Sequence, residues 1–308
     1  MPPIPILLIT GFLGAGKTTL LNHLLQQPGI REKNLALIIN EFGATGVDGA
    51  LVRSGERPKF ELNKGSLFCI CVKTDFLKTL DEIARRVRPE LLIIEATGIA
   101  ETRDLMAFVD EPYLRDQFRI RANVCLVDAA NFTKVAPSLK AARGQVRWAD
   151  GIVINKADLA HLDDLAKLRG VLREMNPEAS LATVTHGAIE PGFIEGLRHR
   201  ERPGDLLTEP PDPLFSESFE TPEPVDRARF RKVVGELGDA LLRLKGWVRF
   251  ADSQGMEFVE LVGPDLFMRP APDRSGPTQF VAIGWKVRQA DLRARFEATW
   301  GQGTIGLR

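Results

Sequence analysis

A glycine-rich segment that ends in a lysine and a threonine carries the clearest chemistry in the sequence. Residues 11–18 read GFLGAGKT, which fits the pattern G-x-x-x-x-G-K-[ST] in full and lies between an apolar run and a leucine-rich helical pattern. Backbone N–H groups of such a loop wrap phosphate oxygens, and the N-terminus of the following helix favours negative charge. This context favours a phosphate site over a turn that only allows close packing. The predicted site comprises Gly11, Gly14, Ala15, Gly16, Lys17, Thr18 and Thr19, with Lys17 on the β- and γ-phosphates and the Thr18 hydroxyl on Mg²⁺.

A second chemical signal is a glutamate at the end of an apolar run, with a glycine three residues later. Residues 91–98 read LLIIEATG. A carboxylate at the carboxyl end of a strand beside a phosphate loop can hold a metal through water, so Glu95 is a predicted Mg²⁺ ligand. Gly98 can offer its N–H to a γ-phosphate, because a backbone without a side chain approaches closely. The alternative is a buried strand that simply ends at a solvated glutamate.

A third motif follows another apolar run and points to the base of the nucleotide. Residues 151–158 read GIVINKAD. The carboxylate of Asp158 can accept both N1–H and the exocyclic amino group of guanine, a donor pair that adenine does not offer. The aliphatic stem of Lys156 would lie along the base, and Asn155 belongs to the same element. A polar turn is the alternative; beside the phosphate loop, these residues predict GTP rather than ATP.

The three motifs, in this order and spacing, resemble the P-loop GTPases of the CobW/HypB/UreG group, which serve metal centres, and most closely the CobW-type branch. Residues 40–43 (NEFG), with Gly46 and Asp48, resemble the first switch of that branch, and residues 95–98 resemble its E-x-S/T-G motif. Gln145, ahead of the third motif, also agrees. The sequence of residues 243–247 (RLKGW) resembles the start of the branch's small second domain. The resemblance is strong to about residue 187 and weaker beyond about 220.

The cysteine element departs from the family pattern, which is G-C-x-C-C and is proposed to bind the cargo metal. Residues 65–72 read GSLFCICV, so aligning the glycine matches only Cys69, whereas aligning C-x-C matches Cys69 and Cys71. Two thiolates two residues apart can chelate a thiophilic ion if the backbone bends, and Glu41 in the switch would add an oxygen ligand. The alternative is that both cysteines are small buried apolar residues. Cys125 lies inside an apolar run and is predicted to be core.

The resemblance implies a GTP-dependent metallochaperone that delivers a transition metal, zinc or cobalt, to a client protein. Its predicted catalytic residues are Lys17, Asp48, Glu95 and Gly98, with Asp48 orienting water or binding metal. Intrinsic hydrolysis is expected to be slow, because no glutamine or arginine finger is visible in the sequence. A regulatory GTP-binding module that moves no metal is the second hypothesis, and a small-molecule kinase is the third.

Short apolar runs that alternate with helical patterns must position these motifs. The runs at 4–9, 35–39, 91–94, 124–127 and 151–154 alternate with helical patterns that include 18–25, 75–87 and 162–175. Strands that are apolar on both sides predict a doubly wound, mostly parallel α/β sheet over residues 1–200. A proline-rich linker at 201–220 and a small α+β domain at 221–308 follow. In the latter we expect helices at 225–244 and 289–298 and strands at 246–250, 257–262 and 279–283.

Composition narrows the classes of partner and compartment. The 308 residues include 41 Lys and Arg and 41 Asp and Glu, so no excess of positive charge favours nucleic-acid binding. No apolar stretch reaches the roughly 18 residues of a membrane span, and the N-terminus lacks the basic region of a signal peptide. Three cysteines are too few for a disulfide framework. We expect a cytoplasmic protein that binds neither nucleic acid nor membrane.

Overall fold

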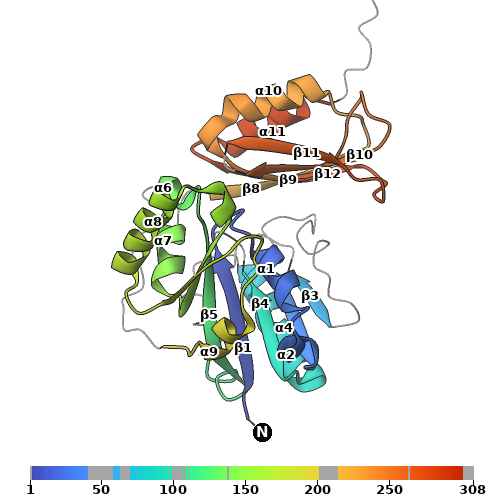
Figure 1. Ribbon diagram of the computed structural model, residues 1–308. Coiled ribbons are helices and arrows are strands. Elements are labelled where there is room, and N and C mark those ends of the chain that lie inside the picture. The colour runs from blue at the N-terminus through green and yellow to red at the C-terminus, as the bar shows by residue number, and fades with distance from the viewer. Residues whose placement is uncertain are drawn as a thin grey trace, which may run out of the picture. The chain divides into compact units, whose positions relative to one another are not determined.

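The structure is a computed structural model that describes residues 2–40, 58–62, 70–96, 98, 106, 109, 111–136, 139–200, 214–262 and 264–300. The chain divides into two compact units (Figure 1). The described residues up to Arg200 form the first unit, and those from Leu214 onward form the second. Each unit has its own sheet and its own apolar core.

The first unit is built on a seven-stranded sheet in the order β3-β2-β4-β1-β5-β6-β7, in which every neighbouring pair is parallel. The first strand along the chain, β1, lies in the middle, and the chain fills in neighbours on both sides of it. This is the predicted doubly wound sheet. Its strands are β1 (Ile4–Gly11), β2 (Leu35–Asn40), β3 (Lys59–Leu62), β4 (Leu91–Glu95), β5 (Phe118–Asp128), β6 (Gly151–Asn155) and β7 (Ser180–Thr183).

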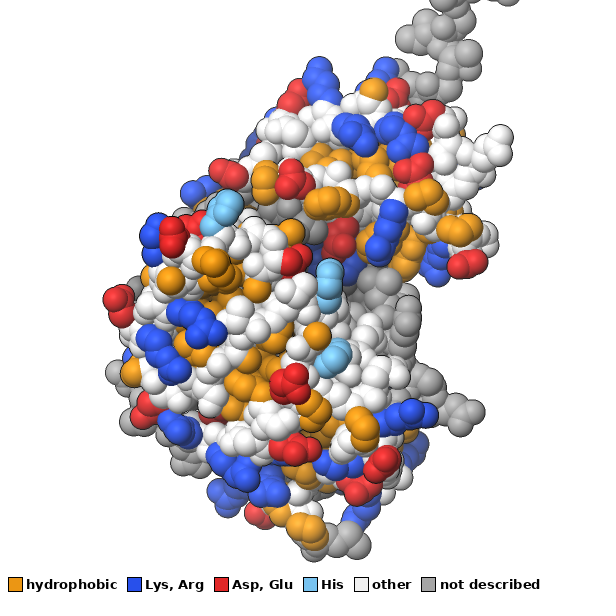
Figure 2. Space-filling model, viewed as in Figure 1, with side chains coloured by type: hydrophobic (Ala, Val, Ile, Leu, Met, Phe, Trp, Pro, Cys, Tyr) orange, Lys and Arg blue, Asp and Glu red, His pale blue; other side chains and the backbone are white. Residues whose placement is uncertain are grey.

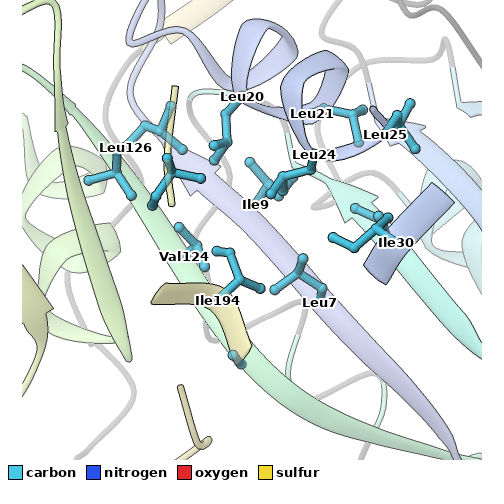
Figure 3. Packing of buried hydrophobic residues seen from close by; sticks show 14 of the residues in the cluster. Leu7, Ile9, Leu20, Leu21, Leu24, Leu25, Ile30, Val124, Leu126 and Ile194 are labelled. Atoms are coloured by element: carbon cyan, nitrogen blue, oxygen red, sulfur yellow. The ribbon is translucent and has the colours of Figure 1, made fainter. Parts of the chain in front are cut away.

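Helices cover both faces of this sheet, because the central strands present apolar side chains to both faces. On one face Ile6 and Leu8 pack with Phe76 and Leu80 of the helix that precedes β4. On the other face Leu7 and Ile9 pack with the leucines of the first helix (Figure 3). The described helices are α1 (Lys17–Leu24), α2 (Pro28–Arg31), α4 (Ile70–Glu82, extended by a π-helical turn, Ile83–Val87), α6 (Phe132–Val135), α7 (Lys140–Arg147), α8 (Leu162–Met175) and α9 (Pro191–Gly196).

The second unit is an antiparallel five-stranded sheet in the order β11-β10-β9-β12-β8, packed against two helices. Its core is aromatic: Phe219 and Phe280 stack at a centroid distance of 4.6 Å, and Phe230 and Phe296 meet both the sheet and each other. The elements are β8 (Leu214–Thr221), α10 (Arg227–Leu237), β9 (Leu241–Arg249), β10 (Met256–Val262), β11 (Asp265–Pro270), β12 (Thr278–Trp285) and α11 (Gln289–Glu297). This is the predicted small α+β domain.

Two boundaries in the C-terminal half differ from those predicted. The helix predicted over 225–244 ends at Leu237, because Gly238 takes a positive φ of 48° and turns the chain into a short 3₁₀ segment and then β9. The predicted linker, 201–220, overlaps strand β8, which begins at Leu214. The apolar alternation of β8 is interrupted by Glu217, a buried carboxylate that Gln289 and Arg293 contact, so the segment looks polar in sequence.

Candidate nucleotide site

The glycine-rich loop joins the carboxyl end of the central strand to the N-terminus of α1. Strand β1 ends at Gly11 and α1 begins at Lys17. Two of the glycines are required by close packing and by a positive φ, 131° at Gly11 and 101° at Gly16. A Cβ on Gly11 would lie 2.4 Å from the carbonyl oxygen of Leu126, and one on Gly16 would lie 2.2 Å from Nδ2 of Asn155. The loop therefore lies directly against the ends of β5 and β6.

Lys17 folds back over the loop instead of pointing to solvent. Its Nζ donates hydrogen bonds to the carbonyl oxygens of Gly11 at 2.9 Å and Phe12 at 3.3 Å, and the residue is 7% exposed. The ammonium group is thus held inside the curve of the loop. A fixed positive charge there, next to the helix N-terminus, suits the oxygens of a bound phosphate chain.

Thr18 and Glu95 meet beside the loop. The Thr18 hydroxyl donates a 2.8 Å hydrogen bond to Oε1 of Glu95, which is 4% exposed. They meet because β4 pairs with β1 in parallel, with Glu95 opposite Ile9. A hydroxyl and a carboxylate are the hard oxygen donors that Mg²⁺ takes together with phosphate oxygens, so this pair fits the predicted Mg²⁺.

Gly98 lies close to Leu13 of the phosphate loop. A Cβ at this position would come within 2.5 Å of Cδ2, 2.7 Å of N and 2.9 Å of Cα of Leu13, so only glycine fits without a shift of the loop backbone. The carbonyl oxygen of Gly98 accepts a 3.1 Å hydrogen bond from Nε2 of Gln145. The structure thus brings Gly98 together with the loop, as the predicted γ-phosphate contact requires.

Asn155 ties the end of β6 to the phosphate loop. Its Nδ2 donates to the carbonyl oxygen of Ala15 at 2.9 Å, and its Oδ1 accepts from the N–H of Gly187 at 2.9 Å. Asn155 therefore links its own loop to the phosphate loop and to the loop of Gly187. Its predicted contact with the nucleotide stays a prediction.

Lys156 and Asp158 follow directly after β6, which ends at Asn155. Lys156 has a positive φ of 61°, and its Nζ lies 2.8 Å from Oδ2 of Asp128, the last residue of β5. Oδ1 of Asp128 accepts from the N–H groups of Ala130 and Asn131, so the carboxylate is fixed in turn. Asp158 is exposed in a 3₁₀ turn, Ala157–Leu159. Sequence reasoning missed Asp128, although it shares with Glu95 the signal of an acidic residue that ends an apolar run.

The predicted cargo-metal residues lie largely outside the described part of the chain. Glu41, Asp48 and Cys69 are outside it, and Cys71 is described only as backbone in α4. Among the residues that the structure does describe, no three His, Cys, Asp or Glu side chains come together as a metal site. Burial raises the pKa of the Cys125 thiol to about 12, so this cysteine is a neutral core residue, as predicted.

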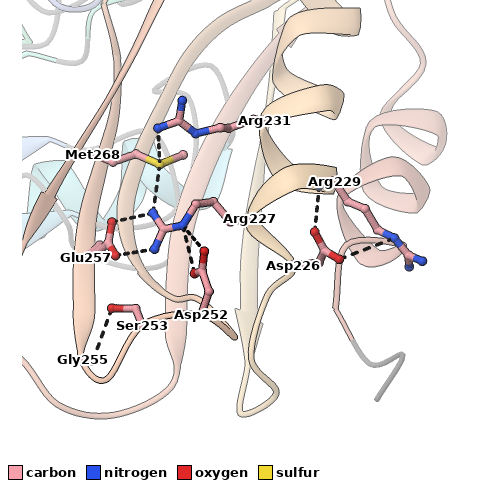
Figure 4. Close-up of polar contacts among 9 residues, drawn as sticks. All are labelled: Asp226, Arg227, Arg229, Arg231, Asp252, Ser253, Gly255, Glu257 and Met268. Carbon is pink, nitrogen blue, oxygen red and sulfur yellow. Dashed lines mark hydrogen bonds and ion pairs between the residues drawn. The ribbon is translucent and has the colours of Figure 1, made fainter. Parts of the chain in front are cut away.

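An ion-pair cluster around Arg227 joins α10 to the sheet of the second unit (Figure 4). Arg227 of α10 donates to both carboxylate oxygens of Glu257 at 2.8 and 2.6 Å and to Asp252 at 2.8 Å, and its guanidinium lies over the ring of Phe250. These hydrogen bonds hold the pKa of Glu257 and of Asp252 below their ordinary values. Glu257 lies on β10 and Arg227 on α10, so the cluster ties α10 to the sheet.

The surface carries both signs of charge. On the face shown in Figure 2, Lys and Arg side chains are interspersed with Asp and Glu side chains on both units. No helix in the described ranges has the length and apolar character needed to cross a membrane.

Comparison with known proteins identifies relatives along the whole chain. The family model described as "CobW/HypB/UreG, nucleotide-binding domain" matches residues 5–183, and "Cobalamin synthesis protein cobW C-terminal domain" matches residues 216–299. "Zinc chaperone YjiA" of Escherichia coli is 30% identical over 96% of this chain and 98% of its own length. "Zinc chaperone CobW" of Pseudomonas aeruginosa is 27% identical, covering 94% and 89%. "Zinc-regulated GTPase metalloprotein activator 1" of Schizosaccharomyces pombe is 30% identical, covering 62% and 48%.

A solved structure belongs to the same set. The crystal structure of Zn(II)-bound YjiA GTPase from E. coli is 28% identical to this chain and covers 98% of it and 100% of that chain, with a TM-score of 0.46. The nucleotide-binding model covers more than half of the 308 residues, and the E. coli relative matches nearly end to end. The predicted resemblance is confirmed: the chain belongs to the CobW/HypB/UreG family.

Proposed function

We propose that this protein is a GTP-hydrolysing metallochaperone, which couples GTP hydrolysis to delivery of a transition metal to a client protein. The observation that carries the proposal is the meeting of three loops at the carboxyl edge of one sheet. The phosphate loop, the Glu95–Gly98 segment and the Asn155–Asp158 segment are joined there by hydrogen bonds and by backbone packing. The names of the relatives in E. coli and S. pombe support both the GTPase and the metal part of this proposal.

The selectivity for guanine rests on Asp158. Its carboxylate accepts the N1–H and the exocyclic amino group of guanine, and Lys156 supports one side of the base. The carboxylate of Asp128, 2.8 Å from Nζ of Lys156, holds that side chain in place before any nucleotide binds. Adenine presents an unprotonated N1 and no donor at C2, so it would leave the carboxylate unpaired.

Hydrolysis depends on charge stabilisation at the phosphate loop. The ammonium of Lys17, the N–H groups of the loop and the N–H of Gly98 surround the γ-phosphate, where negative charge builds up in phosphoryl transfer. Thr18 and Glu95 would hold Mg²⁺, which would supply positive charge next to the phosphate chain. Asp48 is proposed to orient the attacking water. We expect slow turnover of the isolated protein, because no arginine finger is visible in the sequence.

The cargo site is proposed to consist of Cys69, Cys71 and Glu41, with zinc or cobalt as the metal that is handed on. Three protein ligands leave one position open for transfer to a client, whereas a closed four-ligand zinc site holds its metal by roughly 10–16 kcal/mol. Moving a site from 1:99 to 99:1 occupancy takes about 5.5 kcal/mol of differential affinity, and loss of one ligand between nucleotide states is our proposed source. Thiolate ligands need a reducing compartment, and we place the protein in the cytoplasm.

The test is a titration of the metal-free protein with Co²⁺ under reducing conditions, once with Mg-GTP and once with Mg-GDP, following the thiolate-to-cobalt charge-transfer band. The proposal expects a band whose affinity differs between the two nucleotides and which disappears in the Cys69→Ser, Cys71→Ser variant. Cys125→Ala is the matched control and keeps the band, because Cys125 is buried in β5. No band with either nucleotide would reject the thiolate site and favour the regulatory GTP-binding module. The departure of this chain from the family's cysteine pattern supports that alternative.

A further inference from the structure

A buried glutamine outside the three nucleotide motifs contacts the γ-phosphate segment directly. Gln145 of α7 is 1% exposed, and its Nε2 donates a 3.1 Å hydrogen bond to the carbonyl oxygen of Gly98, 47 residues away in sequence. Gly98 also lies so close to Leu13 of the phosphate loop that a Cβ on it would come within 2.7 Å of the Leu13 backbone nitrogen. Gly98 is thus held between the phosphate loop and the side chain of Gln145.

The helix that carries Gln145 is itself fixed. The amide of Asn176, which is 3% exposed, donates to the carbonyl oxygens of Val146 at 2.8 Å, Arg147 at 3.2 Å and Ala149 at 2.9 Å. These are the last carbonyls of α7 and those just beyond it, which the helix leaves without intrahelical partners. Gln145 therefore contacts Gly98 from a helix whose C-terminal end is held by hydrogen bonds.

We propose that Gln145 is a positioning residue that lets the protein distinguish GTP from GDP. By holding the Gly98 carbonyl, it fixes the backbone at Gly98 so that the N–H lies where a γ-phosphate oxygen can accept from it. GDP has no oxygen at that place, so the contribution of Gln145 is confined to the triphosphate. This inference rests on the proposed GTPase function, because it assigns a role within that site.

The experiment compares Gln145→Leu, which keeps the volume and removes the donor, with the wild-type chain. Dissociation constants for GDP and for a non-hydrolysable GTP analogue are measured in the presence of Mg²⁺, along with kcat and KM for GTP. We expect affinity for the GTP analogue to fall about tenfold, equivalent to about one lost hydrogen bond, while affinity for GDP stays within about twofold. Gln145→Met also lacks the donor, is unbranched like glutamine, and should give the same change in ratio if Gln145→Leu does not fold.

Gln27→Leu is a matched control. Gln27 is also a buried glutamine of this unit, and its Nε2 donates at 2.8 Å to a distant backbone carbonyl, that of Ile189. We expect Gln27→Leu to lower the melting temperature without changing the ratio of GTP to GDP affinity. Equal weakening of both nucleotides in the Gln145 variants, or no change in either, would overturn the inference. Failure of the wild-type chain to bind or hydrolyse GTP would instead reject the proposed function.

Discussion

At the scale of single residues, the carboxylate of Asp128 holds Lys156, the lysine that is proposed to support the base. It accepts two backbone N–H groups through Oδ1 and contacts Nζ of Lys156 through Oδ2 at 2.8 Å. Both side chains are largely buried, so the pair is less screened than an ion pair on the surface. The lysine therefore does not have to be ordered when a nucleotide binds, which lowers the entropic cost of binding.

The first prediction concerns this pair. Asp128→Asn should weaken GDP and GTP binding equally, by about tenfold, because Lys156 acts on the base, which both nucleotides share. Dissociation constants for GDP and for a non-hydrolysable GTP analogue measure this. In a chain that already carries Lys156→Met, Asp128→Asn should cost little more. Full additivity of the two losses would show that Asp128 does not act through Lys156.

At the scale of the elements, one asparagine closes the end of α7. Replacing Asn176 by alanine removes the Nδ2 donor from three carbonyls, two of them in buried hydrogen bonds, and also removes the acceptor of the Ala179 N–H. We expect the free energy of unfolding of the first unit to fall by about 2–3 kcal/mol, measured by urea denaturation. Asn34→Ala, at an exposed position, should stay within about 0.5 kcal/mol. A comparable loss in both variants would contradict the special role of Asn176.

The contact between α10 and its sheet should depend on pH. Arg227 lowers the pKa of Glu257, whose ordinary value is 4.5, so the stabilisation is complete above about pH 4.5 and is lost as pH falls through the lowered value. Arg227→Met should therefore destabilise the second unit at pH 7, and the difference from wild type should shrink towards pH 3. Tryptophan fluorescence during urea denaturation at several pH values follows this.

Arg231→Met is the control for that series. Arg231 lies on the same helix and contacts Met268, as Arg227 does, and no contact with a carboxylate is described for it (Figure 4). Its variant should show the same pH dependence as the wild type. If the difference between Arg227→Met and wild type did not change with pH, the ion pair with Glu257 would not be its source.

At the scale of the whole molecule, the two cores are separate, and ligand binding should therefore act on one of them. The apolar clusters of the first sheet and the aromatic cluster of the second share no residue. GDP with Mg²⁺ at 100 times its dissociation constant should stabilise the first unit by about 2.7 kcal/mol. Trp148 lies in the first unit, so the measurement uses a Trp148→Phe chain, in which the remaining tryptophans report on the second unit: Trp247, Trp285 and Trp300. Their unfolding midpoint should not move. If the midpoint of the tryptophan signal moved together with the unfolding midpoint of the first unit, the two units would unfold as one.

Much of the fold and of the site could be predicted because the signals are local. The phosphate loop, the parallel strands and the three nucleotide motifs each occupy a short stretch whose pattern determines its conformation. Asp128 and Gln145 were not assigned their contacts, because those contacts form only when β5 pairs with β6 and when α7 packs near Gly98. Strand β8 was predicted as linker, because a buried Glu217 needs Arg293 and Gln289, which arrive much later in the chain.

The fastening of the phosphate loop by Asn155 has a consequence for the growing chain on the ribosome. Residues 11–18 are synthesised well before residues 155 and 187, yet Ala15 gains its partner only with Asn155, and Asn155 is held in turn by Gly187. The central strand also waits, because its neighbours β4 and β5 are made later. A nascent chain that ends before Asn155 carries the complete phosphate motif without the strand and loop that hold it. Nucleotide capture is therefore a late event in synthesis, although its best-known motif comes first.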